Sequence, residues 1–93
     1  MAVGRSERFA AIRPRVVELF GDEAGTLARV AQVLELTELA WHDCHGEPGP
    51  PPKVVDDILA CSGGTLDGLV DAAHLAVVDA RDLALRASGA RGQ

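Results

Sequence analysis

Five adjacent residues, Trp41, His42, Asp43, Cys44 and His45, hold most of the side chains in this sequence that are able to do chemistry. They include the only tryptophan, two of the three histidines and one of the two cysteines. Imidazole, thiolate and carboxylate groups are common zinc ligands and common catalytic bases and nucleophiles. The question is whether this cluster binds a metal, reacts with a substrate, or only ends a helix.

The register of the predicted helices indicates which distant residues lie near the cluster. A helix that returns from residue 65 brings His74 about 13 Å back along the bundle, level with residues 41–45. By the same measure, Cys61 lies too far from Cys44 for a disulfide, which needs Cα atoms within about 7 Å. His45, His74 and Cys44 are therefore the set that we expect to converge.

Three interpretations of this set remain open. With a water molecule, His45, His74 and Cys44 match the three protein ligands of a catalytic zinc site. Cys44 with either histidine would form a nucleophile and its base, although the sequence contains no recognisable oxyanion donors. In the structural interpretation, Trp41 closes one end of an aliphatic core, and His45 lies at the free carbonyls of a helix terminus. We expect the structural interpretation to hold, with no cofactor, and keep zinc as the alternative.

Two pairs of carboxylates form a second candidate site. Glu35 and Glu38 lie one turn apart on one predicted helix, and Asp79 and Asp82 lie one turn apart on another. The arrangement resembles the all-α nucleotide pyrophosphohydrolases, and the resemblance implies Mg²⁺ held against the phosphates of a nucleotide. The second pair departs from the Glu-x-x-Asp pattern of that family. No basic residue follows that would hold a triphosphate.

Residues 52–73 have the outline of a helix-turn-helix, a short helix, a glycine-containing turn and a second helix. A DNA-binding element needs cations that meet phosphates. From Val54 to Ala80 the sequence contains no lysine or arginine and five aspartates. This composition excludes DNA recognition by the segment.

The composition predicts a small, acidic, helical protein. The chain has 93 residues, a formal net charge of −5 and 3% aromatic residues. Alanine, leucine and valine with few aromatic residues suit close-packed helices better than a sheet. No run approaches the roughly 18 uncharged apolar residues of a membrane span, and the N-terminal residues lack a signal-peptide core. We therefore expect a cytoplasmic protein that does not enter the membrane.

Helix signals predict a single all-α domain over residues 1–93, a small bundle of two long and two shorter helices. The helices are expected at about 22–44 and 65–87, at about 6–20 with a break at Pro14, and at about 52–61. The proline-rich stretch 46–52 excludes helix and strand alike and predicts a rigid connector. Residues 88–93 are expected to form a flexible tail.

Apolar residues recur at alternating spacings of three and four in both long helices. The two predicted core seams are Leu27, Val30, Leu34, Thr37, Trp41 and Cys44, and Leu66, Val70, Ala73, Val77, Ala80, Ala84 and Ala87. Leu36 and Leu39 widen the apolar surface of the first long helix, so it contacts more than one neighbour. Leu75, Val78 and Leu85 lie behind the second seam, and they predict a dimer surface or a face that the N-terminal segment covers.

Charge is distributed unevenly along the chain. Both ends are rich in arginine, whereas residues 16–80 contain only Arg29 and Lys53 against twelve acidic residues. We expect the ends to pair with the acidic middle of the same chain. The alternative is complementarity between two copies of the chain.

Together these patterns predict a non-catalytic cytosolic protein that acts through protein–protein interaction, as a homodimer and without DNA or membrane partners. The alternatives are a metal-binding helical protein, which would use His45, His74 and Cys44, and a Mg²⁺-dependent enzyme similar to the nucleotide pyrophosphohydrolases.

Overall fold

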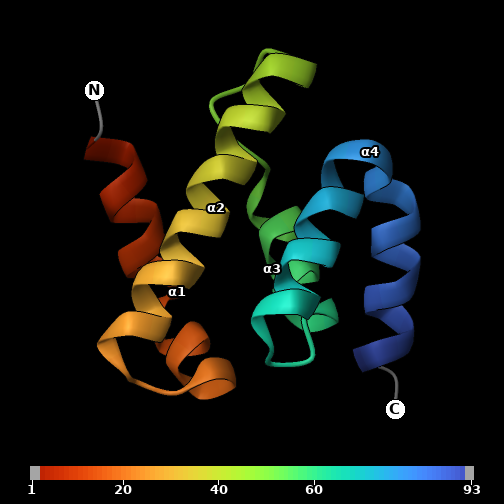
Figure 1. Ribbon diagram of the computed structural model, residues 1–93. Coiled ribbons are helices and arrows are strands. Elements are labelled where there is room, and N and C mark those ends of the chain that lie inside the picture. The colour runs from red at the N-terminus through yellow and green to blue at the C-terminus, as the bar shows by residue number, and fades with distance from the viewer. Residues whose placement is uncertain (1–2, 92–93) are drawn as a thin grey trace.

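The computed structural model describes residues 3–91 and shows a bundle of four α-helices (Figure 1). The helices are α1 (Val3–Phe20), α2 (Ala24–His45), α3 (Pro52–Cys61) and α4 (Leu66–Arg91). No strand occurs among these residues. The predicted all-α architecture of two long and two shorter helices is confirmed, with element bounds that differ by a few residues.

Helix α1 runs through Pro14 instead of breaking there. A proline inside a helix removes one backbone hydrogen bond and crowds the preceding turn. Packing holds the two sides of the proline in one helix, because Val16 is fully buried and Phe9 and Ile12 pack against the core. The sequence prediction of a break gave weight to the local preference of proline and missed this tertiary support.

Helix α2 is the central helix, and its predicted seam is largely confirmed. Leu27, Val30, Leu34, Thr37 and Trp41 are all buried. Cys44, the last member of the predicted seam, is exposed. The helix ends as expected at Gly46, which has a φ of 72° and donates its backbone N–H to the carbonyl oxygen of His42.

Helix α3 begins at Pro52, where a missing backbone N–H costs nothing. Its core residues are Ile58 and Leu59, and the carboxylate residue Asp57 is also buried. Pro50, in the connector before it, is buried too. The proline-rich segment therefore packs against the bundle and fixes where α3 starts.

A tight turn joins α3 to α4. Thr65 caps α4 as expected, since its Oγ1 accepts a hydrogen bond from the backbone N–H of Gly68 at 3.0 Å. Gly68 lies so close to the turn that a Cβ at this position would be 1.9 Å from the carbonyl oxygen of Ser62. The close approach requires a glycine.

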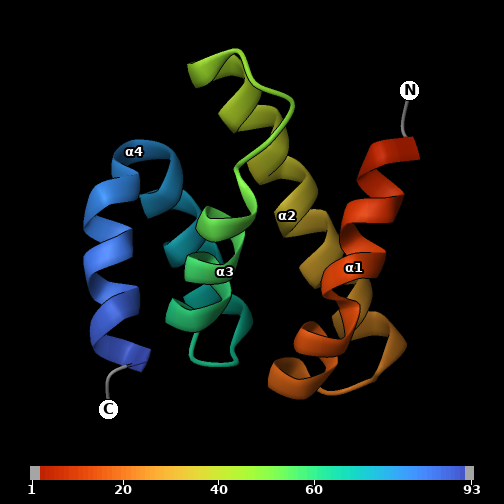
Figure 2. The same cartoon turned by 180° about the vertical axis from the view of Figure 1, so that it is seen from behind.

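Helix α4 is the largest departure from the sequence prediction. Asp79 has φ −157° and ψ 81°, which interrupts the helix, and Figures 1 and 2 show α4 turning back on itself at its middle. Its Oδ1 accepts a hydrogen bond from the backbone N–H of Asp82 at 3.1 Å, so Asp79 is the N-cap of the second half. The helix continues to Arg91, and residues 88–91 of the predicted flexible tail are helical; residues 92 and 93 lie outside the described residues.

The reversal also changes which residues of α4 face the core. The buried residues are Leu69, Ala72, Ala73, Ala76, Leu83 and Ala87. Val70, a member of the predicted seam, is 49% exposed. The break resets the helical phase, so a single periodic seam through residues 66–87 does not exist.

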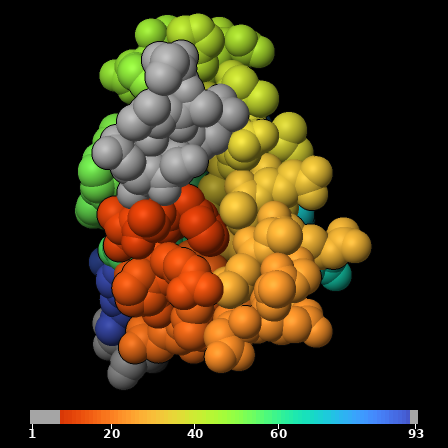
Figure 3. Space-filling view, turned by 90° about the vertical axis from the view of Figure 1, so that its left-hand side faces the viewer, coloured from red at the N-terminus to blue at the C-terminus, as the bar shows by residue number. Residues whose placement is uncertain are grey.

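The helices pack mainly with their neighbours in sequence. Helix α3 packs most extensively against α4, α2 packs against α4, and α1 packs chiefly against α2. Figure 3 shows α1 on the outside of the bundle, next to α2. None of the described helices is long and apolar enough to cross a membrane.

Candidate interaction site

The cluster at residues 41–45 is a helix terminus. Trp41 is buried, and its indole Nε1–H donates a hydrogen bond to Glu47 Oε1 at 2.8 Å. The ring of His45 lies against the indole, with 4.1 Å between ring centroids. Trp41 thus closes one end of the core, as the structural interpretation expects.

The structure does not gather the predicted zinc ligands into a site. Cys44, His45 and His74 are all exposed. Within residues 3–91, no three histidine, cysteine, aspartate or glutamate side chains are grouped closely enough to hold a metal ion. The zinc interpretation stays a prediction with no geometric support in this part of the chain.

The carboxylate pairs of the magnesium interpretation have structural partners. Asp79 caps the second half of α4, and Asp82 forms an ion pair with Arg86 at 3.1 Å. Glu38 forms an ion pair with Arg8 of α1 at 2.6 Å. These contacts join helices or cap them, and each carboxylate is held by its own chain.

Both cysteines are free thiols. The Cys61 thiol points at the carbonyl oxygen of Leu83, 3.9 Å away. Burial, followed by the negative charge of Asp57, raises the pKa of this thiol. A raised pKa keeps Cys61 protonated at neutral pH and makes it a poor nucleophile.

The predicted interface residues divide into two groups. Leu75 is half-buried and packs against the core of its own chain. Val78 and Leu85 are 67% and 68% exposed. On α2, Leu36 and Leu39 are exposed as well, although the sequence pattern suggested a second neighbour for them.

A groove opens between α1, α2 and α3, with a volume of about 410 Å³. Its apolar lining comes from all three helices, and it consists mainly of Phe9, Ile12, Leu34, Val55, Ile58 and Leu59. The only hydroxyl in the lining is that of Thr37, and it donates to the carbonyl oxygen of Val33 at 2.7 Å. The walls of the groove are therefore apolar, and the charged groups lie around them. The sequence analysis missed this groove, because it depends on the distance between helices.

Two ion pairs connect α1 to the other walls of the groove. Arg8 Nε donates to Glu38 Oε2 of α2, and Arg15 Nη1 donates to Asp56 Oδ1 of α3. Arg8 and Arg15 are seven residues apart, so they lie on one face of α1 about 10 Å apart along its axis. These pairs position α1 over the groove.

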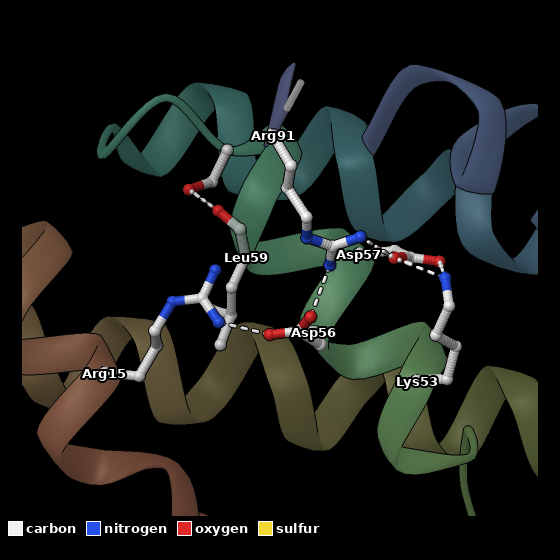
Figure 4. Close-up of polar contacts among 7 residues, drawn as sticks. Arg15, Lys53, Asp56, Asp57, Leu59 and Arg91 are labelled. Carbon is white, nitrogen blue, oxygen red and sulfur yellow. Dashed lines mark hydrogen bonds and ion pairs between the residues drawn. The ribbon is translucent and has the colours of Figure 1, made fainter. Parts of the chain in front are cut away.

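Asp56 belongs to a wider charge cluster that joins three helices (Figure 4). Its second oxygen accepts from Arg91 of α4, and Arg91 also pairs with the buried Asp57 at 2.9 Å. Lys53 donates to both oxygens of Asp57 at 2.9 Å. The expected pairing between the basic ends and the acidic middle of the chain is confirmed by Arg8, Arg15 and Arg91.

The charge cluster keeps Asp57 ionised. Burial acts most strongly on this carboxyl and by itself raises its pKa. The hydrogen bonds and positive charges of Lys53 and Arg91 together outweigh burial, and the net pKa of Asp57 is lowered. The same hydrogen bond from Asp57 is the main reason that the pKa of Arg91 is raised.

With the geometry in hand, comparisons with models of known protein families, with curated proteins and with solved structures find no match to this chain.

Proposed function

We propose that the protein is a small non-catalytic helical module that acts in the cytoplasm through protein–protein interaction, as a homodimer. The observation that carries the proposal is the exposure of large apolar side chains on two helices, Leu36 and Leu39 on α2 and Val78 and Leu85 on α4. Full burial of one such side chain contributes about 1.5–3 kcal/mol, so a surface that covers them gains substantial free energy.

Charges next to these side chains favour a second copy as the partner. Asp43 lies one turn after Leu39 on α2, and Arg81 lies one turn before Leu85 on α4. Both charged residues are exposed, and neither forms an ion pair within residues 8–91. In a two-fold dimer each copy supplies both surfaces, so an apolar and acidic face of α2 meets an apolar and basic face of α4 twice.

The cysteine chemistry supports the proposed compartment. Cys44 is exposed and Cys61 is half-buried, and both are reduced. Free exposed thiols suit the reducing conditions of a cytoplasm.

The test is the mass of the protein in solution, measured by multi-angle light scattering over a range of micromolar concentrations. We expect twice the chain mass for the wild type and the single chain mass for Leu36→Glu and Leu85→Glu. Both substituted positions are exposed, so circular dichroism should show unchanged helix content. A wild-type mass of one chain throughout this range would refute the proposal.

A charge reversal tests the orientation of the dimer. Arg81→Glu places a carboxylate opposite the acidic face of α2, and we expect it to weaken the dimer at low salt. Arg13→Glu is the matched control, because Arg13 is exposed on α1 and forms no ion pair with any residue from 8 to 91. Equal effects of the two reversals would show that net charge, and not a face of α4, controls association.

A further inference from the structure

We infer that the groove between α1, α2 and α3 binds a small amphiphilic acid, a molecule with one apolar chain and one carboxylate. The inference concerns a surface separate from the proposed dimer faces. It rests on the volume of the groove, its apolar lining and the unequal state of the hydrogen-bonding groups at its rim.

The size and lining of the groove suit the apolar part of such a ligand. Its volume of about 410 Å³ lies within the range of about 300–1,000 Å³ typical of small-molecule sites. Phe9 and Ile12 of α1 face Val55 and Ile58 of α3 across it. An alkyl chain there would exchange water for apolar side chains and would leave no polar group of the lining without its hydrogen bond.

The guanidinium groups at the rim have hydrogen-bond donors to spare. A guanidinium carries five N–H donors, and Arg8 and Arg15 each donate one hydrogen bond to another residue of the described chain. Their side chains are 47% and 36% exposed, so a ligand carboxylate reaches them from solvent. Arginine binds carboxylates with two parallel hydrogen bonds, which adds strength and fixes orientation.

The carboxylates at the rim offer less to a cationic ligand. One oxygen of Asp56 accepts from Arg15 and the other from Arg91. Glu38 Oε2 accepts from Arg8. A cation would compete with an arginine already in place, whereas an anion joins donors that are not yet used. The rim therefore selects a negatively charged head group.

Figure 4 shows how the head group would be held. Arg15 of α1 and Arg91 of α4 approach Asp56 from two sides, and Asp57 anchors Arg91 from behind. Arg15 is thus held at the rim by a fixed carboxylate, which reduces the entropy that it would lose when it binds a ligand.

Three ligands with the same chain and different head groups test the inference. Isothermal titration calorimetry would use dodecanoate, dodecan-1-ol and dodecyltrimethylammonium, each below the concentration at which it aggregates. We expect one dodecanoate per chain and binding at least tenfold weaker for the other two. Equal or tighter binding of dodecyltrimethylammonium would overturn the inference, as would no binding of any of the three.

Variants locate the site. Ala31→Phe and Ala11→Phe fill the groove from α2 and α1, and we expect either to abolish binding of dodecanoate. Ala28→Phe is the matched control, since Ala28 is exposed on α2 and lies outside the groove. Because Ala11 is exposed, its variant should fold even if Ala31→Phe does not. Undiminished binding by Ala11→Phe would place the ligand elsewhere and overturn the inference.

The head group has its own variants. Loss of a hydrogen bond to a charged group costs about 1.5–3 kcal/mol, so Arg15→Gln should weaken dodecanoate binding about tenfold or more and leave dodecan-1-ol unchanged. Arg13→Gln, on the same helix but outside the groove, should not change either affinity. Equal losses in the Arg13 and Arg15 variants would overturn the assignment of the head group.

Two further arms separate this site from other outcomes. The Leu85→Glu variant should still bind dodecanoate, because Leu85 lies outside the groove, so failure of the dimer proposal leaves this test intact. Vesicles of phosphatidylglycerol present the same anionic charge in a bilayer. Cosedimentation with these vesicles, combined with no binding of free dodecanoate, would identify a membrane surface and contradict the inference.

Discussion

Gly68 and Gly89 form a matched pair, because both lie in α4 at helical positions and only one of them is crowded. A Cβ on Gly68 would lie 1.9 Å from the carbonyl oxygen of Ser62 and 2.9 Å from Thr65 Oγ1. A Cβ on Gly89 would have no neighbour within 4 Å. Gly68→Ala and Gly89→Ala therefore add the same methyl group to the same helix with opposite consequences.

The expected magnitude follows from the distances. Ordinary contact begins at 3.4 Å, so the Ser62 carbonyl must move by 1.5 Å, the difference between 3.4 and 1.9 Å. Overpacking of this kind costs about 1–3 kcal/mol, and the obstacle is backbone, which does not rotate away. Alanine gains up to about 1 kcal/mol over glycine in a helix interior, and less near a terminus. We expect a net loss of about 2 kcal/mol for Gly68→Ala and a small gain for Gly89→Ala.

Thermal and urea unfolding followed by circular dichroism at 222 nm measure both effects. In a domain of this size, 1 kcal/mol shifts Tm by about 4–8 °C, so Gly68→Ala should lower Tm by about 8–16 °C. Gly89→Ala should raise Tm by a few degrees. An unchanged urea m-value would show that the unfolded state is the same in both variants. Equal Tm values for the two variants would refute the packing of the α3–α4 turn against α4.

Three other predictions concern the charge cluster, the break in α4 and metal binding. Asp57→Asn should lower the free energy of unfolding by about 1.5–3 kcal/mol at pH 7, because it removes the charge that Lys53 and Arg91 bind. Since the pKa of Asp57 is lowered in the folded protein, its contribution is present above its unfolded pKa of about 3.9 and is lost as the pH falls further; pH-dependent unfolding would contradict this if wild type and variant lost stability in parallel at acid pH. Asp79→Ala should cost about 1 kcal/mol through loss of the N-cap, whereas Asp71→Ala on the exposed face of α4 should cost almost nothing in the same unfolding assay. Zinc should not raise Tm, and a rise that depends on zinc concentration would restore the zinc interpretation.

Periodicity located the helices but could not predict how α4 folds. The spacing of Leu27, Val30 and Leu34 correctly placed the core face of α2, because that helix is uninterrupted. In α4 the same method chose Val70, which is exposed, over Leu69, which is buried. Asp79 and Asp82 formed the pattern of a helix N-cap, yet their spacing was interpreted as a metal site. The sequence offered this signal, and a continuous helical pattern on both sides concealed it.

The candidate sites depend on distances that the sequence does not encode locally. The ion pair of Arg15 with Asp56 joins residues 41 positions apart. General charge segregation predicted pairing between the chain ends and the middle, but not which residues pair. The groove arises because α1 packs chiefly on α2 and leaves its other side open toward α3. Only the assembled helices define it.

The reversal of α4 at Asp79 has a consequence for how fast the chain folds. Because α4 turns back, Leu83 and Ala87 join a core that already contains Ala72 and Ala76, close by in sequence. Proteins whose contacts are mostly local fold in microseconds to milliseconds, since little loop entropy is lost before contacts form. The contacts of Asp56 with Arg15 and Arg91 span the longest stretches of chain among the ion pairs described for residues 8–91. We expect this carboxylate to be joined to α1 and α4 after the rate-limiting step, so that its loss speeds unfolding and leaves the folding rate unchanged.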